Sequence, residues 1–130
     1  MVASADSLRL RLEMPERAAP DEPVPITFKV QNVTDRDMDL YLTGRPIAFD
    51  LIVTGEDGEV VWRRLEGETV PMVLRIETLE PGKALELEET WDQRSNVGER
   101  VPPGAYTVRG ELLTEGEPLA TPDSNLRISH

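Results

Sequence analysis

Residues 45–64, with the sequence RPIAFDLIVTGEDGEVVWRR, decide the fold of this chain. Over eight residues an apolar series alternates with a second series, which is the two-residue period of a half-buried β-strand. The apolar series is Ile47, Phe49, Leu51 and Val53, and the second series is Ala48, Asp50, Ile52 and Thr54. We therefore expect a strand with one face toward the core.

The dipeptide Asp57-Gly58 is typical of a two-residue hairpin loop, because both central positions of a type I′ turn need positive φ. The pairs on either side of this loop would be Val53 opposite Trp62 and Gly55 opposite Val60. One face of the hairpin would then carry Phe49, Leu51, Val53, Val60 and Trp62. A slip of one residue would move Trp62 to the polar face, so the pattern specifies the register well.

The same alternation predicts further strands on both sides of this hairpin. They cover residues 7–14, 24–34 and 38–43 before it, and residues 67–79, 85–91, 105–114 and 126–128 after it. The proline-rich residues 15–23 and the aperiodic residues 92–104 are predicted to be loops. The inward-facing residues are predicted to be Leu8, Leu10, Leu12, Met14, Ile26, Phe28, Val30, Val70, Met72, Leu74, Ile76, Leu85, Leu87, Trp91, Tyr106, Val108, Leu112, Leu126 and Ile128.

The segment Glu80-Pro81-Gly82-Lys83 indicates a type II turn, with proline at the second position and glycine supplying positive φ at the third. Two arrangements fit this turn. It closes a hairpin that sets Met72 opposite Trp91 and Ile76 opposite Leu87, or it crosses between two sheets.

Eight or nine short strands without a helical pattern predict an all-β fold, an immunoglobulin-like antiparallel β-sandwich. The length of 130 residues fits one domain over residues 1–130. Tyr106 follows the turn at Pro103-Gly104 and is expected to hold a sandwich corner through its hydroxyl group. Gly110, within the same strand, is expected to mark a bulge or a close backbone approach.

The composition excludes several classes of function. The chain has no cysteine, which rules out disulfides, thiolate metal sites and cysteine nucleophiles. Its 14 basic and 25 acidic residues give a net charge of −11, which disfavours nucleic acids and anionic membrane surfaces as partners. The chain shows no leader pattern and no run of the ~20 apolar residues that a membrane span needs. We expect a cytoplasmic protein, or an extracytoplasmic form if a leader has been removed.

No catalytic, cofactor-binding or metal-binding residues are predicted, and the chain is not expected to be an enzyme. The one histidine, His130, is the last residue, so histidine-centred catalysis has no basis. Asp35, Asp37 and Asp39 imitate the start of a calcium loop, but Leu40 replaces its required glycine. A solvated turn is the better interpretation of these aspartates.

Three other patterns have ordinary structural explanations. Glu56, Asp57 and Glu59 are interpreted as a charged hairpin tip rather than a cation site. Asn32-Val33-Thr34 matches the glycosylation acceptor pattern, which matters only in a secretory pathway. Trp62 and Trp91 are in phase with buried strand faces, so core packing is favoured over a sugar-binding platform.

Several of these pieces, taken in their order along the chain, resemble the BsuPI family, the intracellular proteinase inhibitor domain described from Bacillus. The matching pieces are Phe49-Asp50, Asp57-Gly58 running into Glu59-Val60-Val61-Trp62, Leu79-Glu80-Pro81-Gly82, Trp91, and Pro103-Gly104 with Tyr106 and Val108. The family-like core would cover about residues 24–129. The resemblance implies an immunoglobulin-like sandwich that inhibits a subtilisin-like serine protease.

The resemblance supplies no reactive site, so the candidate protease contacts come from loop properties. A substrate-like inhibitor needs an exposed, extended and preorganised loop, because ordering on binding costs entropy. The first candidate is the loop with Arg94, Ser95, Asn96, Val97 and Arg100, stiffened at its exit by Pro102 and Pro103. The second is the stretch with Val70 and Met72, although Met72 and Leu74 are expected to face the core. An acidic inhibitor could also cover the protease cleft without entering it.

Two other functions remain open. A non-inhibitory immunoglobulin-like module for structural or protein-interaction roles would use the same fold, and its loops would be nicked by a protease in the ordinary way. A carbohydrate-binding sandwich is the third hypothesis, and burial of Trp62 and Trp91 would contradict it.

Overall fold

The computed structural model describes residues 8–43, 48–67, 74–114 and 118–129. These residues form eleven β-strands and no helix, which confirms the predicted all-β class. The strands are β1 (Leu8–Glu13), β2 (Arg17–Ala18), β3 (Val24–Asn32), β4 (Met38–Thr43), β5 (Phe49–Thr54), β6 (Val60–Arg63), β7 (Leu74–Leu79), β8 (Ala84–Trp91), β9 (Gly104–Leu112), β10 (Leu119–Ala120) and β11 (Ser124–Ile128). The two-residue strands β2 and β10 had no counterpart in the predicted set.

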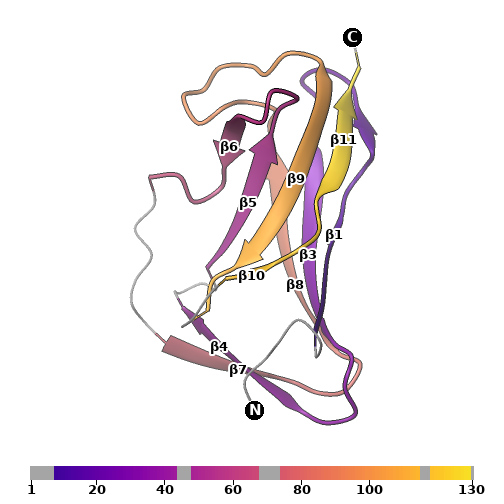
Figure 1. Ribbon diagram of the computed structural model, residues 1–130, viewed down its shortest axis with the longest axis vertical. Coiled ribbons are helices and arrows are strands. Elements are labelled where there is room, and N and C mark those ends of the chain that lie inside the picture. Colours follow the sequence, from indigo (N-terminus) through magenta and orange to yellow (C-terminus); the bar gives the residue numbers. More distant parts are fainter. Residues whose placement is uncertain (1–7, 44–47, 68–73, 115–117, 130) are drawn as a thin grey trace.

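Two main sheets face each other, with β5, β9 and β11 in front of β3 and β8 in the view of Figure 1. One sheet has the order β1-β3-β8, and the other has the order β2-β11-β9-β5-β6, with β10 paired to β9. The neighbours β1-β3-β8 and β11-β9-β5 correspond to strands A-B-E and G-F-C of the immunoglobulin sandwich. The predicted immunoglobulin-like antiparallel β-sandwich is therefore confirmed. Among the described strands, β2 alone departs from the antiparallel pattern, because it pairs with β11 in parallel.

The core lies between the inward faces of β3, β5 and β9. The ring of Phe28 on β3 meets that of Phe49 on β5 edge to face, with centroids 6.2 Å apart. Gly110 on β9 lies directly against the Phe28 ring, because a Cβ atom at this glycine would stand 2.6 Å from two ring carbons. The close backbone approach expected at Gly110 is confirmed. Most of the predicted inward series is buried here, including Leu8, Ile26, Val30, Trp91, Tyr106, Val108, Leu112, Leu126 and Ile128.

The turn between β5 and β6 differs from the predicted two-residue loop. Val53 does pair with Trp62, but Thr54, and not Gly55, pairs with Val60 across a β-bulge. The Gly58 N–H donates to the Gly55 carbonyl oxygen at 3.0 Å, and Gly58 alone in the turn has positive φ, at 84°. This is a three-residue loop with a type I turn and a G1 bulge, which needs positive φ at one position only. The shift leaves Val60 52% exposed instead of facing the core.

The turn between β7 and β8 has the predicted type but joins strands of different sheets. Lys83 N–H donates to the Glu80 carbonyl oxygen at 3.0 Å, and Gly82 has φ of 77°, as a type II turn requires. However, β7 pairs with β4 and β8 pairs with β3, so the hairpin alternative for residues 67–91 is wrong and the crossing alternative holds.

The orientation of β7 also differs from the prediction, because the face that was expected to point inward is exposed. Leu74 and Ile76 are 53% and 56% exposed, because they lie on the outer face of the two-stranded β4–β7 sheet. The inner face of that sheet carries the buried Met38, Leu40 and Leu42 of β4 together with Leu79 of β7. The predicted core positions of Val70 and Met72 lie outside the described residues.

Candidate functional site

The loop that joins β8 to β9, residues 92–103, arches over β6 at one end of the sandwich (Figure 1). Arg94 and Arg100 form an isolated antiparallel bridge across it. Within this bridge, Ser95 N–H donates to the Glu99 carbonyl oxygen at 2.7 Å, and Gly98 N–H donates to the Ser95 carbonyl oxygen at 2.9 Å. Gly98 has φ of 84°. The tip is therefore a closed three-residue hairpin turn of the type I plus G1 bulge kind, not an extended segment.

The loop is attached to the free edge of β6 by Asn96. The Asn96 Oδ1 accepts a hydrogen bond from Arg63 N–H at 2.8 Å, and its Nδ2 donates to the Arg63 carbonyl oxygen at 2.9 Å. The backbone N–H of Asn96 donates to the Val61 carbonyl oxygen at 3.3 Å. Asn96 thus satisfies backbone groups that an edge strand otherwise exposes to water.

Arg63 is itself fixed by a buried carboxylate. Its Nε and Nη2 donate to Asp50 Oδ2 at 3.0 and 2.8 Å, and Asp50 Oδ1 accepts from Leu65 N–H at 3.0 Å. Asp50 is only 2% exposed, and these bonds satisfy both of its oxygens. The hydrogen bond to Asp50 raises the pKa of Arg63 above its usual value. The β6 edge that receives the loop is consequently held to β5 by a charged pair.

A second attachment joins the start of the loop to the turn between β2 and β3. The side chain of Gln93 is buried, and its Nε2 donates to the carbonyl oxygens of Ala19 and Glu22, both at 2.8 Å. Its Oε1 accepts from Asp21 N–H at 3.3 Å. Gln93 and Asp21 both have positive φ, 62° and 65°, which is uncommon outside glycine and marks two constrained turns in contact. An ion pair between Arg100 and Asp21 closes the same junction.

Aromatic residues fix both ends of the loop to the core. Trp91, at the end of β8, is fully buried, and its Nε1 donates to the Arg94 carbonyl oxygen at 3.0 Å. Its ring packs against those of Trp62 and Tyr106, with centroids 6.0 and 6.2 Å away. The Tyr106 hydroxyl donates to the Pro102 carbonyl oxygen, which confirms the predicted tyrosine corner. Burial, with the nearby carboxylates of Glu56 and Asp57, raises the pKa of Tyr106.

The exposed side of the loop presents an apolar tip. Val97 is 80% exposed, and beside the loop Val60 of β6 is also exposed. Between them lies a depression with a volume of about 580 Å³, whose apolar lining is completed by Val61, Val101 and Pro102. The charged residues Glu66, Glu99 and Arg100 also line it. We call Val60, Val97 and this depression the loop surface.

The structure brings all five residues of the first predicted contact loop together, but they play different parts. Arg94 donates from Nη1 to the Gly98 carbonyl oxygen at 3.0 Å, and Arg100 pairs with Asp21, so both arginines help to hold the loop. The Ser95 Oγ accepts from the N–H groups of Val97 and Glu99, each at 3.3 Å. Val97 is the side chain left projecting. The second predicted contact pair, Val70 and Met72, lies outside the described residues.

Residues at the attachments could not have been identified from local patterns. Gln93 and Asp21 are 72 positions apart, and Asn96 and Arg63 are 33 apart. The one local signal was the aperiodic stretch itself, which predicted a loop. The two-residue alternation around Asp50 predicted a strand but gave no sign of a buried ion pair.

The other patterns noted in the sequence have structural roles here. Asn32 is fully buried, and its Nδ2 donates to the carbonyl oxygens of Arg36 at 2.7 Å and Leu79 at 2.9 Å, so its amide is not accessible as a glycosylation acceptor. Trp91 is buried and Trp62 half-buried, as core packing predicted. Within the described residues, no group of three or more acidic or histidine side chains is arranged to hold a metal ion. No helix in the same residues is long and apolar enough to cross a membrane.

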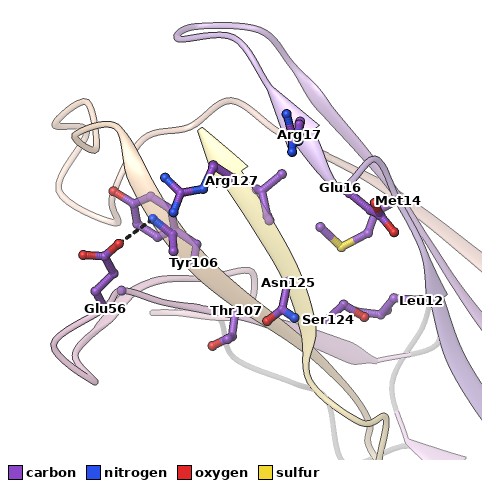
Figure 2. A pocket seen from close by; sticks show the side chains of 13 residues that line it. Leu12, Met14, Glu16, Arg17, Glu56, Tyr106, Thr107, Ser124, Asn125 and Arg127 are labelled. Carbon is purple, nitrogen blue, oxygen red and sulfur yellow. Dashed lines mark hydrogen bonds between the residues drawn. The ribbon is translucent and has the colours of Figure 1, made fainter. Parts of the chain in front are cut away.

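A second depression, of about 760 Å³, lies where the chain leaves β1 for β2 and passes β11 (Figure 2). Its lining mixes the apolar Leu12 and Met14 with Arg17 and Arg127, which are direct partners across β2 and β11. Glu56 enters it from the β5–β6 turn and accepts a hydrogen bond from Ala105 N–H at 2.9 Å. This contact ties the β5–β6 turn to the start of β9.

Fold and site together define an immunoglobulin-like β-sandwich that presents a rigid, exposed loop at one end. The sequence model of the BsuPI family, described as "Intracellular proteinase inhibitor", matches residues 12–117 of the chain. The chain therefore belongs to the BsuPI family. This membership supports a proteinase inhibitor function with a protease as partner, and the family is named for inhibition rather than for an enzymatic activity.

Comparison with solved structures finds the same fold within larger proteins. An alkylpurine DNA glycosylase from Pseudomonas fluorescens, bound to DNA containing an abasic site analogue, and a sporulation control protein from Bacillus subtilis both match with a TM-score of 0.53 and 14% identity. Each match covers 95% of this chain, but only 31% of the glycosylase and 50% of the sporulation protein. At this identity the likeness shows the fold alone. No curated protein matches the chain.

Proposed function

We propose that this protein inhibits a subtilisin-like serine protease by placing the loop surface over the protease's binding cleft, without being cut. The observation that carries the proposal is Val97, which is 80% exposed at the tip of a loop whose backbone is fixed on both sides. Family membership supplies the function class. The choice of a subtilisin-like target comes from the resemblance to the founding inhibitor and from the chemistry of the tip.

The rigidity of the loop favours tight binding. Ordering a flexible loop on association costs free energy, and a loop held in its bound conformation avoids that cost. Asn96 holds the tip to β6, Gln93 holds the entry to the β2–β3 turn, and Tyr106 holds the exit through Pro102. These three attachments come from different elements, so the loop is preorganised before any partner arrives.

The shape of the tip favours covering the cleft over acting as a substrate. A protease binds the segment it cuts in an extended conformation, with backbone N–H and C=O groups free to pair with the enzyme. In this loop the N–H groups of Ser95 and Gly98 and the carbonyl oxygen of Ser95 are bonded within the turn. Cleavage between Asn96 and Val97 would require the turn to open, so the bound inhibitor should stay intact.

The chemistry of the tip fits a cleft with apolar subsites. An exposed aliphatic side chain gains free energy when a partner removes it from water. Val97 and Val60 line one depression together with Glu99 and Arg100, so the loop surface offers apolar and charged contacts side by side. Subtilisins prefer apolar residues in their binding clefts, which is the basis for this target class.

A matched pair of valine variants tests the proposal. Val97→Asp places a charge at the tip of the loop. Val33→Asp makes the same change at an exposed valine that directly follows the last residue of β3. Each variant is titrated against a subtilisin-type protease, and its inhibition constant is compared with that of the unmodified protein. We expect Val97→Asp to weaken inhibition at least about tenfold, which corresponds to roughly 1.4 kcal/mol, and Val33→Asp to leave it unchanged.

If the unmodified protein inhibits the protease and Val97→Asp inhibits it equally well, the protease contact does not lie on the loop surface. A protease that keeps full activity while the loops of this protein are nicked would instead favour a non-inhibitory immunoglobulin-like module.

A further inference from the structure

We infer that β7 is a self-association edge, along which a second copy of this chain pairs in antiparallel fashion about a twofold axis at Ile76. This inference concerns a different face from the loop surface and goes beyond inhibition. It rests on the exposed edge of β7, on its apolar outer face and on the order of its charged residues.

Among the described residues, the edge of β7 lacks most of the features that usually protect an exposed strand. Among the described strands, β4 is the only one that pairs with β7. The six pairs between them, from Met38 with Leu79 to Thr43 with Leu74, run without a bulge. The β7 sequence LRIETL contains no lysine and no proline. Natural proteins often protect edges with lysine or other charged residues, with proline, with bulges or with a covering segment. Of these features, described β7 has only the charged Arg75 and Glu77, which pair with each other.

The outer face of the β4–β7 sheet is apolar beside this edge. Leu74 and Ile76 are among the most exposed large apolar side chains of the described residues, and Tyr41 of β4 lies directly across from Ile76. Two copies joined at β7 would place these faces side by side in one four-stranded sheet. Cross-strand apolar pairs on such a face are the unit of sheet stabilisation.

The charges of β7 select the partner and the register. In an antiparallel pair centred on Ile76, each Arg75 stands opposite Glu77 of the second copy, and Ile76 stands opposite Ile76 of the second copy. Antiparallel ladders alternate between two kinds of residue pair, and a twofold axis can pass through either kind. Arg75 and Glu77 already attract each other within one chain, with Nη2 and Oε1 2.9 Å apart. A second copy of the same strand therefore complements it in charge, as an isologous interface requires.

This dimer would leave both loop surfaces free. Strand β7 lies at the end of the sandwich opposite the β8–β9 loop (Figure 1). Because a single strand pair buries less area than the ~1,200 Å² of a stable interface, association should depend on protein concentration.

Sedimentation velocity on the full chain tests the inference, at loading concentrations up to about 1 mM, where weak pairs still associate. Ile76→Lys would place two lysines opposite each other, and like charges directly opposite disfavour pairing. Val97→Lys is the control, because it adds the same charge at the far end. Arg75→Glu would put two acids opposite each other, and the double variant R75E/E77R would restore complementary pairs. Melting temperatures show that each variant is folded.

We expect a concentration-dependent dimer for the unmodified protein and for Val97→Lys. Ile76→Lys and Arg75→Glu should weaken dimerisation at least tenfold, and the double variant should recover it. A single-chain mass at every concentration would overturn the inference. A dimer that persists in both single variants, or that the double variant fails to restore, would also overturn it.

Discussion

The side-chain amide of Asn96 makes two hydrogen bonds to the backbone of Arg63, one to its N–H at 2.8 Å and one to its carbonyl oxygen at 2.9 Å. The amide thereby takes the place of a further strand residue along the free edge of β6. Arg63 is held in turn by the buried carboxylate of Asp50. The loop that presents Val97 is therefore continuous with the sheet beneath it.

Asn96→Ala should release the tip of the loop without unfolding the sandwich. Both lost hydrogen bonds lie at the surface, where water replaces them, so the free energy of unfolding should fall by only about 1 kcal/mol. The free energy of binding to the protease should weaken by more than about 1 kcal/mol, because the loop must then be ordered on binding. Thermal melting and the inhibition constant measure the two effects. Asn125→Ala, at an exposed asparagine on β11, is the control. Equal inhibition by all three proteins would show that attachment of the loop has no functional role.

Gly58→Val should destabilise the hairpin through backbone conformation alone. Gly58 has φ of 84°, and a Cβ atom there would meet no atom within 4 Å, so steric crowding is excluded as a cause. A branched side chain in the left-handed region costs about 1–2 kcal/mol. Gly58→Asn should cost less, because asparagine tolerates this region better. Denaturant unfolding of the two variants checks the difference, and an equal loss in both would contradict the turn assignment.

The two tryptophans should differ in their contribution to stability. Trp91 is fully buried between Trp62 and Tyr106, so Trp91→Ala should cost about 3–5 kcal/mol. Trp62 is half-buried on the same cluster, and Trp62→Ala should cost less than Trp91→Ala but more than about 1 kcal/mol. Chemical denaturation of both variants gives these values. A loss of less than about 1 kcal/mol for Trp62→Ala would place that ring on the surface and make a glycan-binding platform worth testing.

Because of Tyr106, the free energy of unfolding should vary with pH in the alkaline range. Burial raises the pKa of Tyr106 above the ordinary value of 10.0, and Glu56 and Asp57 add to the effect. The folded state holds the Tyr106 hydroxyl proton more tightly than the unfolded state does. The resulting contribution to the free energy of unfolding is therefore complete below about pH 10 and is lost as the pH rises through the folded pKa. Unfolding free energies of the unmodified protein and of Tyr106→Phe, measured from pH 7 to pH 11, should therefore converge at the alkaline end. A constant difference between them would contradict the assigned pKa shift.

Much of the strand pattern could be predicted from the sequence, because burial on one face imposes a two-residue period. The inward series of β3 and β9 were predicted correctly for this reason. The expected half-buried strand at β5 is wrong in one respect, because Asp50 and Ile52 on its second face are buried as well as Phe49, Leu51 and Val53. The β5–β6 turn was not predicted correctly, since Asp57-Gly58 suits two loop types and only the pairing of Gly55 with Glu59 separates them. The partner of β7 could not be predicted either, because a type II turn has the same local sequence whether or not its flanking strands pair.

The candidate site was predicted only as a loop. Residues 92–104 lacked periodicity, which located Arg94, Ser95, Asn96, Val97 and Arg100 on a surface connection. Nothing local indicated that Arg94 and Arg100 would hold the loop while Val97 projects. Those roles depend on Asp21 and on β6, which are far away in the sequence, and on a buried glutamine that propensity would place at the surface.

The central claim is that this protein inhibits a protease through a closed loop that is not cut. The most direct measurement mixes the unmodified protein with a subtilisin-type protease at increasing molar ratios and follows both residual activity and the intact mass of the inhibitor. We expect activity to fall to zero near a one-to-one ratio, with the peptide bonds of the β8–β9 loop uncut. Full protease activity with a cut between Ser95 and Gly98 would contradict the claim.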